Sequence, residues 1–517
     1  MSATAATPGD LTKVSHRGII TVCAMVATLM QSLDSTIANV ALPYMQGSLS
    51  ASYDEITWVL TSYVIAAAIM TAPVGWLAAR FGQKNLFLVS VIGFTIASMA
   101  CGVASSLYEM VLDRLIQGAF GAALVPLSQG TMLNVYPSER RGAAMAIWGM
   151  GVMVGPILGP TLGGYLTELY NWRYVFYVNL PFGIATTLGL LWFLPAERSE
   201  SSLRFDWFGF TVLALGLSGL QLMLDRGETQ DWFNSTEIII EAVTAAGGFY
   251  LFFVHLLTAQ KPFITPRIFL DRSFALSTVV MFAVGMVLLA SSALLAPWLE
   301  DLGGYPVETA GLLLAPRGIG TMLALLIAGK ISNSVDPRWV MALGVALLSW
   351  SLWRLSAWTP AVDEVTLAVN TTIQGAGLGF TFLPLNVVAF ATLPARSRYE
   401  GAALMSLLRN IGSAVGVSIF EALQVNSAEV EHSVLAPFAS PLNRTLQTTP
   451  QIVHLVSPAT RHGAALLDQM IGYQAQVIAY NNDYWLMGVL ALLILLLLPF
   501  MRRPRLDAKD GGPAMSE

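Results

Sequence analysis

Long apolar segments separated by short polar connectors are the dominant pattern along the chain. Fourteen of these segments reach the length of about 20 mostly apolar residues that a membrane-spanning helix needs. Most connectors are short, which implies helices rather than barrel strands. The pattern therefore predicts an all-α polytopic membrane protein with 14 transmembrane helices. The predicted spans are 18–41, 56–79, 86–105, 110–134, 143–166, 174–195, 207–225, 237–257, 274–298, 308–329, 338–358, 364–390, 401–424 and 483–501.

Composition supports this interpretation and excludes several other classes of protein. Charged residues make up 11% of the 517 residues and hydrophobic residues 55%, with a mean hydropathy of +0.63. Ordinary globular chains carry roughly 25% charged residues. A soluble enzyme, a DNA-binding protein and a secreted disulfide scaffold are therefore excluded. The two cysteines, Cys23 and Cys101, both lie inside apolar runs, which argues against a disulfide framework.

The basic residues orient the predicted spans. Nineteen of the 27 Lys and Arg residues fall in segments on the side of the two termini, five fall on the opposite side, and three lie within spans. Cytoplasmic segments of membrane proteins carry an excess of Lys and Arg. We therefore expect both tails, residues 1–17 and 502–517, to be cytoplasmic.

An internal repeat divides the chain. Segments 117–145 and 374–403 both contain a Gln-Gly pair, then Pro-Leu, then a Pro before a basic loop, and finally Gly-Ala-Ala at closely matching spacing. Such parallel repeats are typical of transporters built from two membrane halves. The repeat predicts six-helix halves over 18–195 and 259–501, with two inserted helices in 196–258. The alternative is chance similarity between apolar segments.

The stretch 425–482, between the last two spans, is an unusually long polar segment on the side opposite the termini. Its Gln, Ala, Leu and Ser content could support helices, and the alternative is a solvated loop. We treat it as a periplasmic loop of the second half. Loops of this length are usually functional or disordered.

Two charged residues within predicted spans are candidates for function. Asp34 in the first span and Arg114 in the fourth would be costly to bury in a bilayer, and such residues usually mark functional sites. Asp34 could bind and release a proton, pair with a cationic substrate, or simply form a structural hydrogen bond to Asn39 or to a neighbouring helix. Arg114 stays protonated and needs a partner. It could pair locally with Asp113 or reach the outer interface, but its repeat counterpart is Thr371, which favours a role specific to the first half.

The fifth span carries glycines at a spacing of four together with two prolines. Such glycines let another helix approach closely, and the prolines remove backbone donors and bend the span. This pattern suits an interface that rocks between two states, and the alternative is static packing. The residues are Gly151, Gly155, Pro156, Gly159, Pro160, Gly163 and Gly164.

The loop after the second span combines glycines with cations. Gly75, Arg80, Gly82 and Lys84 suggest a tight turn that serves as a cytoplasmic hinge or latch. The alternative is that the charges only orient the spans, which leaves the glycines unexplained.

The remaining polar candidates are weaker. They are Gln117, Arg317, Arg409, Asn410 and Glu421. No GxxxxGK[ST] phosphate loop, metal-ligand spacing or nucleophile–base pair is evident in the sequence, so neither enzyme activity nor a cofactor is expected. Uphill transport would then draw on an ion gradient.

Several stretches together resemble the major facilitator superfamily, and within it the fourteen-span drug:proton antiporters of the EmrB type. The resemblance covers about residues 15–500. The stretches that carry it are 33–43, 112–123, 151–164, 172–181, 225–233 and 311–318.

This resemblance implies roles and partners. It implies that Asp34 and Arg114 take part in proton coupling, that the location is a Gram-negative inner membrane, and that an EmrA-like periplasmic adaptor and a TolC-like outer-membrane channel complete the pump. The 425–482 stretch becomes a candidate adaptor contact. One position departs from the family, because Ala79 stands where an Asp is usual, so the latch proposed for that Asp cannot operate here as described.

The sequence therefore predicts a proton-driven exporter of amphipathic toxic compounds that works by alternating access. Its substrates would be held in an apolar, aromatic cavity. Three alternatives stay open: an importer or narrow-specificity symporter of the same fold, a non-transporting membrane sensor or scaffold, and, more remotely, a membrane-embedded enzyme.

Overall fold

The computed structural model describes residues 16–196, 203–331, 334–439 and 460–501, and these ranges contain helices and turns but no strand. The tails predicted to be cytoplasmic lie almost entirely outside the described residues. The main helices are α1 (Arg17–Ser48), α2 (Tyr53–Ile56), α3 (Trp58–Thr71), α4 (Val74–Phe81), α5 (Gln83–Val103), α6 (Leu107–Gly121), α7 (Leu124–Val135), α8 (Arg141–Leu169), α9 (Tyr174–Tyr177), α10 (Asn179–Phe193), α11 (Trp207–Arg226), α12 (Thr236–Thr258), α13 (Arg272–Pro297), α14 (Val307–Ile331), α15 (Pro337–Leu355), α16 (Glu364–Ala391), α17 (Arg398–Leu435) and α20 (Arg461–Leu493).

Every predicted span coincides with a helix or a pair of helices. By length and composition, twelve helical segments in the described ranges could cross a membrane, or thirteen if the bent pair α3–α4, with its 57° bend, forms one span. The remaining predicted span corresponds to α15, a 19-residue helix packed between α16 and α20. The predicted all-helical membrane architecture is therefore confirmed, whereas the count of fourteen is not.

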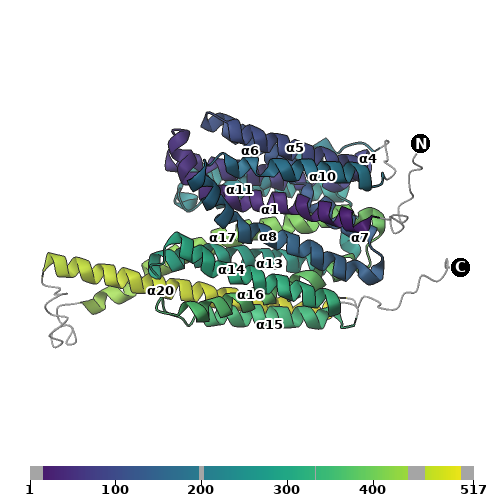
Figure 1. Cartoon of the computed structure of the whole chain (residues 1–517). Helices are drawn as coiled ribbons and strands as arrows, with labels where there is room; N and C mark the ends of the chain where they lie inside the picture. The colour runs from purple at the N-terminus through teal and green to yellow at the C-terminus, as the bar shows by residue number, and fades with distance from the viewer. Residues whose placement is uncertain (1–15, 197–202, 332–333, 440–459, 502–517) are drawn as a thin grey trace.

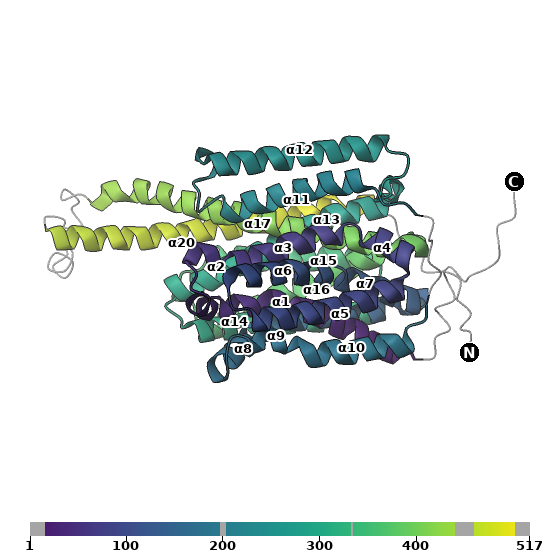
Figure 2. The ribbon, with the colours of Figure 1, turned by 90° about the horizontal axis from the view of Figure 1, so that it is seen from above.

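The helices form an N-terminal group (α1–α10) and a C-terminal group (α13–α20) that lie one above the other in Figure 1. Helix α8 packs against α1 within its own group and against α14 across the boundary. Helix α11 contacts both α3 and α17, and α12 packs on the outside of α11 (Figure 2). The two helices between the groups therefore form an outer layer over the place where α3 meets α17.

The two repeat copies fold alike where they end. In the first, α7 is followed by a 3₁₀ turn (Ser138–Arg140) and then α8, and in the second, α16 is followed by a 3₁₀ turn (Ala395–Ser397) and then α17. The copies differ at their centre, because the first is broken between α6 and α7 whereas α16 is continuous. The matching element order supports a true repeat rather than chance similarity.

The predicted loop over 425–482 is corrected by the structure. Helix α17 continues to Leu435 and α20 begins at Arg461, so both ends of this stretch are helical, while residues 440–459 lie outside the described residues. The two helices project well beyond the bundle (Figures 1 and 2). The 38 residues of α17 correspond to about 57 Å, against roughly 30 Å of hydrocarbon in a bilayer. We call this projection the helical hairpin.

Helices α1, α5, α8 and α17 all begin at the opposite end of the bundle from the hairpin (Figure 1). We call it the basic end, because Arg17, Lys84, Arg141 and Arg398 lie there. Lys84 donates to the carbonyl oxygen of Leu191 at 2.7 Å, which ties the start of α5 to the end of α10.

The two helix groups are joined at the basic end. Arg398 on α17 donates to the Leu133 carbonyl oxygen at 3.1 Å and to Asn134 Oδ1 at 2.9 Å, both on α7. The amide of Asn134 in turn donates to the Tyr399 hydroxyl at 2.9 Å. Close packing of Gly75 on Glu400 adds a contact between α4 and α17. The groups are therefore in contact at this end.

Candidate functional site

The buried charges of the N-terminal group form one connected network. Arg114 on α6 donates from Nη1 to Asp34 Oδ2 on α1 at 2.6 Å and to Gln117 Oε1 at 2.7 Å. Gln117 completes the ring by donating from Nε2 to Asp34 Oδ1 at 2.7 Å. All three side chains are inaccessible to solvent. The pairing of Arg114 with the neighbouring Asp113 and that of Asp34 with Asn39, both considered from the sequence, do not occur in the described structure.

Further partners come from segments far apart in the sequence. Asn179, at the start of α10, donates to Asp34 Oδ1 at 3.3 Å and to the Ser98 hydroxyl at 3.0 Å. Arg114 Nε donates to the Val59 carbonyl oxygen at 3.0 Å, and its guanidinium lies 4.2 Å from the centre of the Tyr63 ring. Sequence reasoning missed these roles. The available signal was a buried Asn inside the 172–181 stretch, which was recognised only as part of a motif.

The ion pair makes the loss of either buried charge costly. Removing one partner from a buried ion pair leaves an uncompensated charge and costs about 3–5 kcal/mol, so neither charge is easily lost alone. A proton on Asp34 would release the guanidinium of Arg114 from its only carboxylate among the described residues. The position of Arg114 and the protonation of Asp34 are therefore linked.

The glycine series of α8 forms a groove that receives α1. Methyl groups added at the glycines would lie within van der Waals distance or closer of α1, with Gly151 facing Met25, Gly155 facing Ser32 and Leu33, Gly159 facing Thr36, and Gly163 facing Ile37. At Gly155 the added carbon would lie only 2.7 Å from the Leu33 backbone nitrogen. The predicted close approach at a spacing of four is confirmed for these positions. It does not extend to Gly164, which has open space around it.

Pro156 leaves a backbone acceptor that α1 uses. A proline lacks the N–H that would otherwise bond to the carbonyl four residues earlier, here that of Val152. The hydroxyl of Ser32 donates to this oxygen at 2.9 Å. Helix α8 nevertheless runs unbroken from Arg141 to Leu169, through Pro156 and Pro160. The proline thus provides a polar contact between α1 and α8 two residues from Asp34.

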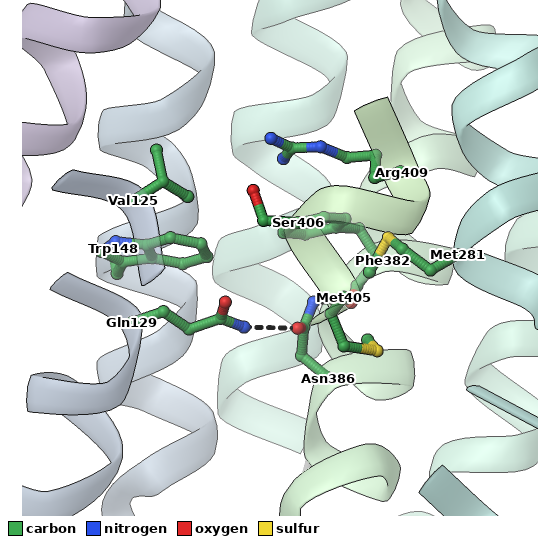
Figure 3. Close-up of a pocket in the computed structure, with 9 residues that line it drawn as sticks. All are labelled: Val125, Gln129, Trp148, Met281, Phe382, Asn386, Met405, Ser406 and Arg409. Atoms are coloured by element: carbon green, nitrogen blue, oxygen red, sulfur yellow. Dashed lines mark hydrogen bonds between the residues drawn. The ribbon is translucent and has the colours of Figure 1, made fainter. Parts of the chain in front are cut away.

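A second site lies where the two groups meet (Figure 3). This central cavity has a volume of about 10 Å³, roughly the room that one water molecule needs. Gln129 and Asn386 close it with a hydrogen bond of 2.6 Å between the groups. They are 257 residues apart and belong to different copies of the repeat, Gln129 to segment 117–145 and Asn386 to segment 374–403. The cavity is lined by Val125, Gln129, Trp148, Met281, Phe382, Asn386, Met405, Ser406 and Arg409.

Trp148 connects the central cavity to the charge network. Its ring lines the cavity, and its indole Nε1 donates to the Thr28 hydroxyl on α1 at 3.1 Å. Thr28 lies six residues before Asp34, or about 9 Å along the helix. Helix α1 therefore carries Asp34 and also contacts a residue that lines the central cavity.

The loop after α4 forms the tight turn that the sequence predicted. A single residue, Gly82, separates α4 from α5, and its φ of 82° is one that favours glycine. Gly75 is needed for the contact with Glu400, because an added methyl group would lie 2.7 Å from the Glu400 Cα. Arg80 is half-buried on the last turn of α4, and Ala79 is exposed.

The weaker polar candidates fall in different places. Gln117 belongs to the charge network. Arg409 on α17 lines the central cavity, and Asn410 follows it on the same helix without lining the cavity. Arg317 on α14 is buried against α13, where it bonds to the hydroxyls of Ser291 and Ser292 and to a backbone carbonyl. Glu421 is exposed on α17. No group of three or more His, Cys, Asp or Glu side chains in the described part could hold a metal ion.

Comparison with known proteins identifies a matching family model and several curated relatives. The family model described as Major Facilitator Superfamily matches residues 24–417. The Multidrug export protein EmrB of Haemophilus influenzae is 35% identical over 483 residues, covering 92% of this chain and 94% of the relative. The Escherichia coli K12 protein of the same name is 35% identical over 496 residues, covering 96% and 97%. The Fatty acid resistance protein FarB of Neisseria gonorrhoeae is 31% identical over 497 residues, covering 95% and 97%.

Solved structures share the fold at low sequence identity. The human organic anion transporter MFSD10 aligns with a TM-score of 0.60 and 13% identity, covering 93% of this chain and 99% of its own. The proton:xylose symporter XylE aligns with a TM-score of 0.58 and 14% identity, covering 93% and 95%. At these identities the likeness supports the fold alone.

Proposed function

Because the chain belongs to the Major Facilitator Superfamily, and within it to the EmrB-type multidrug pumps, we propose that it exports amphipathic toxic compounds in exchange for protons. The chain is a transporter rather than an enzyme. The observation that carries the proposal of proton coupling is the solvent-inaccessible ring of Asp34, Arg114 and Gln117. An ionisable network in the membrane interior is costly and usually functional.

In the proposed cycle, Asp34 takes up a proton from the outer side and loses its attraction for Arg114. With the ion pair gone, α1 is no longer tied to α6 by charge, but it keeps its contacts with α8 through the glycine groove, the bond from Ser32 to the Val152 carbonyl oxygen and the bond from Trp148 to Thr28. Small residues allow α1 to shift along α8 without side chains interlocking. The proton is released to the cytoplasm when the ion pair forms again.

Substrate binding would act on the same helix. Trp148 lines the central cavity and bonds to Thr28 on α1. A compound that displaces the Trp148 ring therefore alters a contact six residues from Asp34. We propose that this connection lets protonation and substrate binding favour opposite orientations of the two groups, as alternating access requires.

We propose the bacterial inner membrane as the location, with the basic end facing the cytoplasm. The excess of Lys and Arg at that end supports this orientation. In this arrangement the chain has fourteen spans, with halves over 18–195 and 259–501 and the inserted helices in 196–258. Helix α15 then counts as a span because it packs inside the bundle beside α16.

The helical hairpin supports a proposed assembly with other proteins. It extends α17 and α20 beyond the bundle on the side we assign to the periplasm, and it exposes Val430, Val434, Phe438 and Met470, each at least 53% accessible. Exposed apolar side chains on a projection suit contact with another protein. We propose an EmrA-like periplasmic adaptor as that partner and a TolC-like channel beyond it.

Everted membrane vesicles with a respiration-driven pH gradient test the proposed exchange. We expect amphipathic compounds to dissipate the gradient in vesicles that contain the wild-type protein, and we expect Asp34→Asn to abolish the effect. Asp113→Asn is the matched control, because Asp113 neighbours Arg114 but lies outside the ion pair. Proton release that persists undiminished in Asp34→Asn at equal protein levels would refute the assignment of Asp34.

A further inference from the structure

Arg409 places an unpaired positive charge at the central cavity. It lies on α17, half-buried, with its guanidinium above Ser406 in Figure 3. Among the described residues its only hydrogen bond is a long one, 3.4 Å from Nη2 to Asn410 Oδ1, and no carboxylate lies within 4.0 Å. Arg114, by contrast, is neutralised by Asp34 at 2.6 Å. Arg409 is thus the cavity-lining cation that lacks an anion in the part of the chain that the structure describes.

The other walls of the cavity are suited to an apolar body. Trp148 and Phe382 come from different helix groups, and their rings are nearly parallel, at 17°, with centres 6.3 Å apart. Met281 and Met405 lie beside them, and flexible methionine side chains adapt to ligands of different shape. The neutral polar groups of Gln129, Asn386 and Ser406 can hydrogen-bond to a head group of either sign.

We propose that Arg409 is the charge-selecting residue of the central cavity and that the favoured substrates are amphiphiles with an anionic head, such as a carboxylate, and an apolar body. This inference rests on the proposed export function and specifies its substrate class. A carboxylate matches the planar donor pair of a guanidinium, and charge-assisted bonds are about twice as strong as neutral ones. A cationic head would instead meet a like charge in a poorly solvated site.

The binding form of the cavity must be wider than the one described. About 10 Å³ admits no amphiphile, so the Gln129–Asn386 bond and the Trp148–Phe382 pair must separate to admit one. These four residues come from both groups, whereas Arg409 belongs to the C-terminal group alone. Arg409 therefore stays available to the head group when the groups move apart.

Three pyrene probes that share one body and differ only in the head test this proposal directly. They are 1-pyrenebutyrate, 1-pyrenebutanol and 1-pyrenebutyl-trimethylammonium. Binding to the full chain in nanodiscs is followed by pyrene anisotropy, with empty nanodiscs subtracted, and transport is followed separately by proton release from everted vesicles. We expect the wild type to bind the anion at least about tenfold more tightly than the cation.

Substitutions assign the preference to one side chain. Arg409→Gln should weaken pyrenebutyrate binding by about 10- to 100-fold and change pyrenebutanol binding less than about twofold. Arg409→Lys should keep the preference for the anion with a smaller loss, because it retains the charge but not the planar fork. Arg354→Gln is the matched control, because Arg354 is exposed near the far end of α15, beside Trp350 and Trp358.

The two readouts separate this inference from the proposed function. Equal wild-type affinity for the three probes overturns the role of Arg409 even if Arg409→Gln does not fold. Unchanged pyrenebutyrate binding in folded Arg409→Gln overturns it as well. A strong preference for the anion that depends on Arg409, without proton release by any probe, supports the inference and contradicts proton-coupled export. Proton release by the probes without a preference for the anion supports proton-coupled export and overturns the role of Arg409.

Discussion

A single methyl group placed between α1 and α8 tests the coupling of helix packing to the charge network. In Gly155→Ala the added carbon would lie 2.5 Å from Ser32 Oγ and 2.7 Å from the Leu33 backbone nitrogen. Ordinary van der Waals contact begins near 3.4 Å, so α1 and α8 must separate by about 0.7 Å next to Asp34. Overpacking of this kind costs about 1–3 kcal/mol, and the better helix propensity of Ala returns at most about 1 kcal/mol.

Gly164→Ala provides a control on the same helix. Nothing lies within 4 Å of the added carbon there, so only the gain in helix propensity of up to about 1 kcal/mol applies. We expect Gly155→Ala to lower the midpoint of thermal unfolding in detergent and to slow proton release from everted vesicles at least about fivefold. Gly164→Ala should leave the midpoint of thermal unfolding and the rate of proton release at or above the wild-type values. If the two variants behave alike in both assays, the groove of α8 does not position α1, and the argument fails.

Two further predictions concern the ends of the molecule. Asn134→Ala removes a side chain that bonds to both Arg398 and Tyr399, so it should loosen the contact between the helix groups and increase labelling of a cysteine introduced at the basic end about fivefold. Ala79→Asp, at an exposed position, should leave that labelling unchanged. Equal labelling in both variants contradicts a role of Asn134 in holding α7 to α17. Replacing the exposed Val430 and Val434 by Ser should reduce the drug resistance of cells about tenfold without changing proton release from vesicles. A parallel loss of resistance and of proton release would mean that the helical hairpin serves transport itself rather than assembly.

Local patterns in the sequence were enough to find the membrane helices and the two main charges, but not how those charges are held. The cost of burial singles out Asp34 and Arg114, so periodicity and hydropathy identify both. Asn179 contributes to the same network from a helix that begins 145 residues after Asp34. Only the folded arrangement of α1, α6 and α10 brings these side chains together. The same holds for Arg409, whose place at the cavity depends on which face of α17 turns toward α13 and α16.

The error over 425–482 has a different cause. Hydropathy detects contact with lipid, not helix formation, so a helix that leaves the membrane loses its signal although its backbone continues. Residues up to Leu435 and from Arg461 onward are helical but too polar to be recognised as part of a span. Composition alone left both a helix and a loop possible, and the structure decides for the helix.

The position of α11 makes the two sides of the molecule unequal toward the bilayer. On one side the boundary between the helix groups, where α3 meets α17, is covered by α11 and then by α12 (Figure 2). On the other side α8 and α14 meet directly, with Gly318 packed against Ile157 and Gly329 against Ala146. A compound dissolved among the acyl chains therefore faces an extra wall of two helices on the first side. The inserted helices therefore make the two sides of the boundary differ in thickness, although the two halves themselves are built from a repeat.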